Sequence, residues 1–266
     1  MIDLHCHLLP GIDDGAKDLE TALAMARMAV ADGIRVLACT PHVYPGMFEN
    51  DSHGIRAAIE VLQTRLDEEG IALRLVIGAD AHMTPELPRR LKEGTVPSLG
   101  GTRYFLLEPP HHVSPPRLDE YVFNLLAVGL VPVVTHPERL TWIEEHYELF
   151  QKLVRQGAWM QVTAGSLTGR FGDTPRYWGE RMLDEGLVHI LATDAHSARG
   201  RPPLLAEARE AASRYVGQGE ATNLVEVRPA GILANRPPDK LPALPARSAT
   251  TRRPGRGILK RLFGLR

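Results

Sequence analysis

The sequence has little cysteine, and its two thiols form no pattern that predicts disulfides or a nucleophile. Cys6 and Cys39 each lie within a short apolar segment, which is typical of a protein kept in a reducing compartment. Long apolar runs are also missing, because no stretch approaches the roughly 20 apolar residues of a transmembrane helix. Polar residues around His5 stand where the apolar core of a signal peptide would have to lie. We therefore expect a cytoplasmic protein.

Acidic residues are missing from the C-terminal part of the chain. The last one is Asp239, whereas eight of the 31 basic residues lie in residues 240–266. Residues 1–239 thus carry 23 basic and 32 acidic side chains, although the formal charge of the whole chain is only −1. An acidic body argues against nucleic acid as a partner. The basic tail needs a separate explanation.

The body of the chain alternates between short apolar runs and longer segments of helical period, which is typical of βα units around a parallel sheet. The runs predict seven strands, at residues 2–7, 36–40, 73–77, 104–107, 131–135, 159–163 and 188–193. Most of these strands are apolar throughout, so both faces of the sheet should be covered. The expected fold is α/β and resembles a barrel with one unit fewer than the usual eight.

Helices are expected between these strands. In the first of them, apolar residues recur at helical spacing from Leu19 to Val30, with Asp18 as the N-cap and Gly33 as the stop signal. Further helices are predicted at residues 55–69, 118–128, 143–155, 174–185 and 203–216.

Residues 231–266 are rich in proline and basic residues, which predicts a disordered tail after a folded domain of residues 1–230. The last ten residues regain a pattern, with Ile258, Leu262 and Phe263 on one face of a short helix and basic residues opposite. Two interpretations stay open. The tail either holds the protein at the inner face of an anionic membrane or is a solubilising end, since an isolated helix of about ten residues is marginal in water.

His5 and His7 are the first candidates for metal ligands. Alternate side chains of a strand point the same way, so the spacing His5-Cys6-His7 places two imidazoles on one side. Such a pair can chelate a divalent ion. Read alone, it can equally be two unrelated polar residues at the end of a strand.

Further histidines and carboxylates lie at or just beyond the ends of the predicted strands, and in a parallel barrel these ends converge on one face. The nine candidate ligands are His5, His7, Asp14, His42, Asp80, Glu108, His136, Asp194 and His196. A mixed imidazole and carboxylate set suits zinc, manganese or iron. Nine ligands exceed the need of one ion, so two or three ions are expected.

Other residues near these positions are given structural roles. Asp13 is interpreted as a turn residue in the segment that follows the first strand. Surface or packing roles are expected for the remaining histidines, which are His53, His82, His111, His112, His146 and His189.

Two arginines follow the candidate ligands closely. Arg139 lies three residues after His136, and Arg201 lies five residues after His196, with Arg199 as a competitor. Guanidinium groups beside metal ions can bind the non-bridging oxygens of a phosphate, whereas surface salt bridges are the alternative. The chain has neither a nucleophile elbow nor a glycine-rich phosphate loop. Water activated by metal is therefore the expected nucleophile.

Four motifs occur in the order and spacing of a known family. They are the segment HCHLLPGIDDG at residues 5–15, Thr40-Pro41-His42, His136-Pro137-Glu138-Arg139 and Thr193-Asp194-Ala195-His196. Over residues 1–230 the chain resembles the polymerase-and-histidinol-phosphatase (PHP) superfamily. Within it, the chain is similar to the CpsB/CapC-like, manganese-dependent tyrosine-protein phosphatases of capsule and exopolysaccharide operons.

The resemblance implies a distorted TIM-like (β/α)7 barrel with a trinuclear centre, most often of Mn²⁺. It implies three ligand sets and two phosphate-binding arginines: His5, His7 and Asp194 for one ion, Asp80, Glu108 and His136 for a second, Asp14, His42 and His196 for a third, and Arg139 with Arg201 for the phosphate. In one position the chain departs from the family, because Asp80 stands where a bridging glutamate, one methylene longer, is usual.

The function implied by the resemblance is hydrolysis of phosphotyrosine on a protein. Its expected partner is a membrane tyrosine kinase of polysaccharide export. Two other functions stay open from the residues alone. The first is a histidinol-phosphate phosphatase that uses the same metals, and the second is a non-catalytic metal-binding module that docks a partner.

Overall fold

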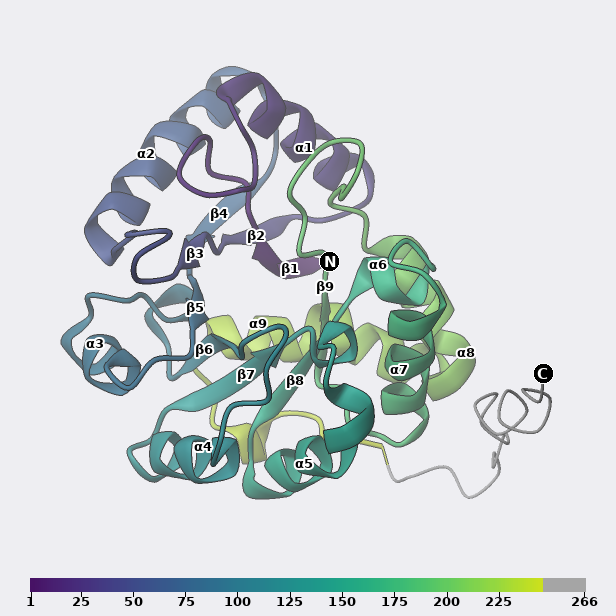
Figure 1. The fold of residues 1–266 in the computed structure, drawn as a ribbon. Coiled ribbons are helices and arrows are strands. Elements are labelled where there is room, and N and C mark those ends of the chain that lie inside the picture. Colours follow the sequence, from purple (N-terminus) through teal and green to yellow (C-terminus); the bar gives the residue numbers. More distant parts are fainter. Residues whose placement is uncertain (246–266) are drawn as a thin grey trace, which may run out of the picture.

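The computed structural model describes residues 1–245, so the predicted terminal helix lies outside the described residues. Parallel strands form the centre of the molecule, and helices pack around them (Figure 1). None of the helices within residues 1–245 has the length and apolar character needed to cross a membrane.

All seven predicted strands are present. They are β1 (Ile2–Cys6), β2 (Val36–Cys39), β4 (Arg74–Ile77), β6 (Tyr104–Glu108), β7 (Val131–Thr135), β8 (Trp159–Thr163) and β9 (Ile190–Ala192). Two short strands are additional to the prediction: β3 (His42–Val43) and β5 (Asp80–His82). Every pairing between neighbouring strands is parallel, as expected for βα units.

The additional strands continue two of the predicted ones after a break. β2 pairs with β4, and β3 then pairs with β5, so two interrupted strands fill two positions of the ring. Pro41, which has no amide hydrogen to donate, separates β2 from β3. Gly78 separates β4 from β5, and a Cβ at this position would come within 2.8 Å of Thr40 Cγ2. The local sequence therefore explains the break.

The ring closes between the first and last strands. The backbone amide of Asp194 donates to the carbonyl of His5 at 2.7 Å, and Cys6 and Ala195 form a parallel bridge. Together with the order β3-β5-β6-β7-β8-β9, these contacts give seven strand positions around the ring. The predicted distorted (β/α)7 barrel is confirmed.

The first helix, α1 (Leu19–Ala31), begins and ends where the sequence predicts. The Asp18 side chain accepts a hydrogen bond from the amide of Thr21 at 2.8 Å, and Gly33 ends the segment with φ of 92°, a conformation that favours glycine. The other predicted helices are α2 (Ser52–Glu68), α4 (Leu118–Ala127), α5 (Ile143–Gln156), α7 (Asp173–Asp184) and α8 (Ala206–Thr222).

Shorter helical segments are additional to the prediction. They are α3 (Leu87–Glu93), α6 (Ala164–Leu167), α9 (Arg228–Leu233), the 3-10 turns η1 (Leu99–Gly101), η2 (Pro137–Arg139) and η4 (Pro238–Lys240), and the π-helical segment η3 (Asn223–Val227). Most of them lie in connections where the sequence has no helical period long enough to predict them.

Packed side chains continue past residue 230. Ile232 of α9 and Leu241 join an apolar cluster with Leu4, Tyr104 and Trp159, and the last two begin their strands. This cluster closes the N-terminal end of the barrel and leaves the opposite end for the candidate site. The division of the chain at residue 230 stays a prediction, because residues 246–266 lie outside the described part.

A fully buried arginine fixes this closing segment. The Arg228 guanidinium pairs with Glu220 at 2.7 Å and donates to the carbonyls of Pro242, at 3.0 Å, and Ala243, at 2.9 Å. A further hydrogen bond reaches the carbonyl of His189 at 3.3 Å. A buried charge with this many partners is well stabilised, but removing it leaves those partners without a donor.

We expect Arg228→Ala to lower the free energy of unfolding by about 3–5 kcal/mol, because Glu220 would keep a largely buried charge without its cation. Urea unfolding followed by circular dichroism measures the change. Arg236→Ala, at an exposed position, is the matched control. A loss of less than about 1 kcal/mol for Arg228→Ala would contradict the structural role of this residue.

Candidate metal centre

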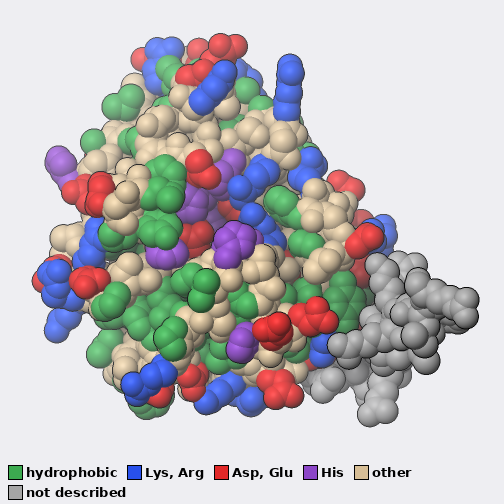
Figure 2. Space-filling model, viewed as in Figure 1, with side chains coloured by type: hydrophobic (Ala, Val, Ile, Leu, Met, Phe, Trp, Pro, Cys, Tyr) green, Lys and Arg blue, Asp and Glu red, His purple; other side chains and the backbone are tan. Residues whose placement is uncertain are grey.

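A hollow on one face of the molecule collects histidine and acidic side chains (Figure 2). It lies at the carboxyl ends of the strands, where barrel enzymes carry their active sites. The structure brings all nine predicted ligands together here: His5, His7, Asp14, His42, Asp80, Glu108, His136, Asp194 and His196. Whether they bind ions stays a prediction.

The first predicted ligand set meets around one point. The Nε2 atoms of His5 and His7 lie 3.2 Å apart. Asp194 Oδ1 lies 3.4 Å from His5 Nε2 and 3.5 Å from His7 Nε2. All three side chains are buried, so the surrounding protein holds them in place.

The side chains of the second set lie farther apart than those of the first. His136 Nε2 lies 3.9 Å from Asp80 Oδ2 and also 3.9 Å from Glu108 Oε1. His136 has a left-handed backbone with φ of 37°, which is uncommon outside glycine and occurs where the surrounding structure enforces it.

The third set lies nearest to solvent. Asp14 Oδ1 is 3.3 Å from His196 Nε2 and 3.5 Å from His42 Nε2. His7 is close enough to belong to this group as well. The Asp14 side chain is 54% exposed, whereas the two histidines are largely buried.

Hydrogen bonds decide which ring nitrogens of His5 and His7 face the cluster. His5 Nδ1 lies 2.9 Å from Gln161 Oε1, and His7 Nδ1 lies 2.7 Å from Asp13 Oδ2. Because both partners are acceptors, each Nδ1 donates to its partner, which leaves the Nε2 atoms of both rings facing the cluster 3.2 Å apart. Two Nε2 atoms that face one point are placed to bind the same divalent cation.

Asp80 supplies a second observation that fits a bound cation. Both of its carboxylate oxygens are buried, and neither accepts a hydrogen bond from any residue in the described part of the chain. Burial alone raises a carboxyl pKa, but the imidazoles of His5 and His136 hold the pKa of Asp80 well below its usual range. A buried carboxylate without donors is costly, whereas imidazole nitrogens and carboxylate oxygens together suit a divalent metal of the first transition row.

Two residues that orient the ligands, Gln161 and Asp13, could not be assigned this role from the sequence. Gln161 of β8 holds the ring of His5, as described above. Asp13 does have the predicted turn role, since its Oδ1 accepts from the amide of Gly15 at 2.9 Å. Its other oxygen accepts from His7 Nδ1 and from the backbone amide of His42, at 3.1 Å. Such outer partners fix the tautomer and orientation of metal-binding histidines.

Gly15 allows this turn to lie against the first strand. A Cβ at residue 15 would come within 2.2 Å of the carbonyl oxygen of His7. Only glycine permits that approach.

His82, for which a surface or packing role was expected, also lies beside a predicted metal ligand at this face. His82 Nδ1 lies 3.4 Å from Glu108 Oε2, and the ring stacks on Tyr44 with centroids 3.8 Å apart. His82 belongs to β5, a strand that the sequence did not predict, so its direction could not be inferred. His189, by contrast, has the predicted packing role: its ring stacks on Trp159, and burial lowers its pKa to about 3.

The two predicted phosphate-binding arginines lie side by side at the edge of the cluster. Arg139 contacts Asp194 Oδ2, and Arg201 Nη2 lies 2.6 Å from the same oxygen. Basic side chains border the hollow in Figure 2. Burial raises the pKa of Asp194, but His5 and the two arginines hold it well below its usual range.

Comparison with known sequences gives strong matches over most of the chain. The family model for capsular polysaccharide synthesis, CpsB/CapC, matches residues 1–234. The tyrosine-protein phosphatase YwqE of Bacillus subtilis (strain 168) is 38% identical over 201 residues, which cover 76% of this chain and 79% of that protein. The tyrosine-protein phosphatase CpsB of Streptococcus agalactiae is 29% identical over 240 residues, covering 88% and 99%.

Comparison with solved structures agrees. Structures of YwqE from Bacillus subtilis and CpsB from Streptococcus pneumoniae, described as metal-dependent tyrosine phosphatases, give a TM-score of 0.87 at 34% identity, covering 93% of this chain and 100% of the matched chain. A TatD-family hydrolase from Entamoeba histolytica shares the fold alone, with a TM-score of 0.52 at 13% identity, covering 88% and 97%.

The fold and the site together define a barrel hydrolase with imidazole and carboxylate groups at the carboxyl ends of its strands. Within this class, the chain belongs to the CpsB/CapC family of capsular polysaccharide synthesis.

We expect Asp13→Asn to lower the affinity for Mn²⁺ by about 10- to 100-fold, because the imidazole of His7 would lose the carboxylate that fixes its tautomer. Competition with a coloured chelator measures the affinity. Asp239→Asn, at an exposed position remote from the cluster, makes the same chemical change and should leave affinity unaltered. Equal affinity of Asp13→Asn and the unmodified protein would contradict the role of Asp13.

Proposed function

We propose that the chain is a metal-dependent protein-tyrosine phosphatase that regulates polysaccharide export by dephosphorylating a bacterial tyrosine kinase. One observation carries the proposal: two arginines converge on one edge of a cluster of nine predicted metal ligands. Family membership adds support, because relatives that share most of their length with this chain are named tyrosine-protein phosphatases.

The nine predicted residues would hold two or three ions, with Mn²⁺ favoured over zinc or iron. His5, His7 and Asp194 are proposed for the first ion, Asp80, Glu108 and His136 for the second, and Asp14, His42 and His196 for the third. The distances within the first and third sets support this division. Divalent ions would supply Lewis acidity and would acidify a bound water toward a pKa of about 7.

Asp80 would help to hold the ions although it is shorter than the usual glutamate. Its Oδ2 atom lies 3.4 Å from His5 Nε2, 3.6 Å from His42 Nδ1 and 3.9 Å from His136 Nε2. One oxygen thus contacts a histidine of each predicted ligand set. Its central position supports a role as a metal ligand.

The arginines are proposed to bind the substrate, and the orienting residues are proposed to act on the metal-binding histidines. Arg139 and Arg201 bind the non-bridging oxygens of the phosphate and stabilise the charge that develops on them. Asp13 and Gln161 keep the Nε2 atoms of His7 and His5 unprotonated and aimed at the cluster. A tyrosine phenolate, with a pKa of about 10, is a tolerable leaving group that needs little acid assistance.

A cytoplasmic location is proposed together with this substrate. Cys6 and Cys39 lie opposite one another on the neighbouring strands β1 and β2, and both are buried free thiols. Free neighbouring thiols fit a reducing compartment. The proposed partner is a membrane tyrosine kinase, so contact with the inner face of the membrane would bring enzyme and substrate together.

The proposed function is tested with two substrates in one assay. We expect protein stripped of metal by a chelator to be inactive and Mn²⁺ to restore hydrolysis of a phosphotyrosine peptide more fully than zinc or iron. Histidinol phosphate should react with a kcat/KM lower by about 100-fold or more. Faster hydrolysis of histidinol phosphate than of the peptide would contradict the proposed substrate and indicate a histidinol-phosphate phosphatase. Full metal content without activity on any phosphoester would indicate a non-catalytic module.

The proposed membrane contact rests on the sequence, because residues 246–266 lie outside the described part. We expect the full chain to co-sediment with anionic liposomes more than a form lacking residues 247–266, since each basic residue near such a surface contributes about 1 kcal/mol. Neutral phosphatidylcholine liposomes are the control. Equal sedimentation of the two forms would rule out this role for the tail.

A further inference from the structure

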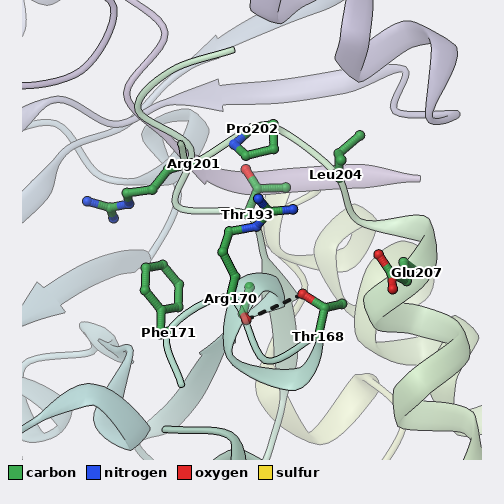
Figure 3. Close-up of a pocket in the computed structure, with 9 residues that line it drawn as sticks. Thr168, Arg170, Phe171, Thr193, Arg201, Pro202, Leu204 and Glu207 are labelled. Carbon is green, nitrogen blue, oxygen red and sulfur yellow. Dashed lines mark hydrogen bonds between the residues drawn. The ribbon is translucent and has the colours of Figure 1, made fainter. Parts of the chain in front are cut away.

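Phe171, in the connection between α6 and α7, lies against both phosphate-binding arginines. The guanidinium carbon of Arg139 is 4.4 Å from the centroid of the Phe171 ring, and that of Arg201 is 5.7 Å from it. Figure 3 shows Arg201 and Phe171 extending to the same side, away from Leu204 and Glu207. A guanidinium at these distances is attracted to the negative face of an aromatic ring.

The backbone around Phe171 is built to place the ring there. Gly169 and Gly172, on either side, have φ of 78° and 86°, which other residues rarely adopt. The amide of Arg170 donates to the carbonyl of Gly165 at 2.8 Å and draws the turn against α6. These constraints fix the backbone from which the ring of Phe171 extends.

Gly165 gives the ring its space. A Cβ at residue 165 would come within 2.7 Å of Phe171 Cε2 and 3.3 Å of Cδ2. The ring is therefore confined by Gly165 on one side and by the arginines on another. A methyl group at residue 165 would push the ring from its place.

The arginines need such a support because they carry like charges and converge on one oxygen. Both contact Asp194 Oδ2, so their guanidinium groups are held close together. Arginine side chains are long and lose much rotamer freedom when they are fixed. A half-buried ring beside both groups reduces the number of positions that they can occupy.

We propose that Phe171 is a positioning residue that holds Arg139 and Arg201 as a pair for phosphate, and that Gly165 is required for this placement. The proposal rests on the proposed phosphatase function and adds to it a residue that does not itself touch the reacting atoms. It predicts a defect in phosphate binding that is separate from metal binding and from stability.

The test uses the full-length, Mn²⁺-loaded protein and orthophosphate as the probe. Phe171→Leu keeps apolar bulk but removes the ring, and we expect it to raise the inhibition constant of orthophosphate by about three- to tenfold with unchanged metal content. Phe171→Tyr keeps the ring and should restore a value close to that of the unmodified protein. Phe123→Leu, at an exposed phenylalanine of α4, is the matched control.

A double-mutant cycle separates positioning from general packing. If Phe171 acts through the arginines, Phe171→Leu should change orthophosphate affinity by less than about twofold once Arg139→Ala and Arg201→Ala are present. Gly165→Ala should reproduce the defect of Phe171→Leu and add nothing to it. An equal effect of Phe171→Leu with and without the arginines would overturn the proposal, as would a normal inhibition constant in Phe171→Leu.

The same measurements distinguish this proposal from the proposed function. Calorimetric titration measures the affinity of the arginine pair for orthophosphate even if the phosphotyrosine peptide is not hydrolysed. If the peptide is not hydrolysed but the effect of Phe171→Leu on orthophosphate binding still depends on the two arginines, only the proposed function is refuted. If the peptide is hydrolysed but the effect of Phe171→Leu does not depend on the arginines, only the proposed role of Phe171 is refuted.

Discussion

Buried negative charge at the carboxyl ends of the strands is the constraint on which the site depends. Within residues 1–245, Asp80 accepts no hydrogen bond, and the Nε2 atoms of His5 and His7 face one another. Isolated charges in such a place cost several kcal/mol, so cations must offset them. The arginines on Asp194 do this at one edge of the cluster. Metal ions are proposed to do it in the middle.

Irregularities of the barrel occur where the cluster needs them. His42 and Asp80 begin the short strands that follow the breaks in two strand positions, and His136 and Asp194 have left-handed backbones with φ of 37° and 50°. Such conformations persist only when the surrounding structure enforces them, and they gather at functional sites. At the opposite end, the packing of Leu241 and the contacts of Arg228 are regular and well satisfied. Packing at one end of the barrel thus stabilises the fold, and the other end holds the candidate site.

Much of the fold could be predicted because it depends on local pattern. The apolar runs gave all seven strands, and the capping aspartate Asp18 gave the start of α1. Since ligands at strand ends follow from where those runs stop, the nine-residue cluster could be predicted as well. Gln161 could not, because it is 156 residues from the histidine that it orients. The partner of His82 was missed for a related reason, since the short strand that carries it has too few residues to form a recognisable pattern.

The sequence by itself determined that histidines and carboxylates end the strands of a (β/α) barrel, and that two arginines follow them. Only the tertiary structure decided which nitrogen of His5 and His7 faces the cluster, since the deciding acceptors come from other segments. It also decided that the ring of Phe171 lies against Arg139 and Arg201. Periodicity tells which side of an element a residue occupies. It carries no information on which side chains meet across the barrel, because that depends on the closure of the whole ring.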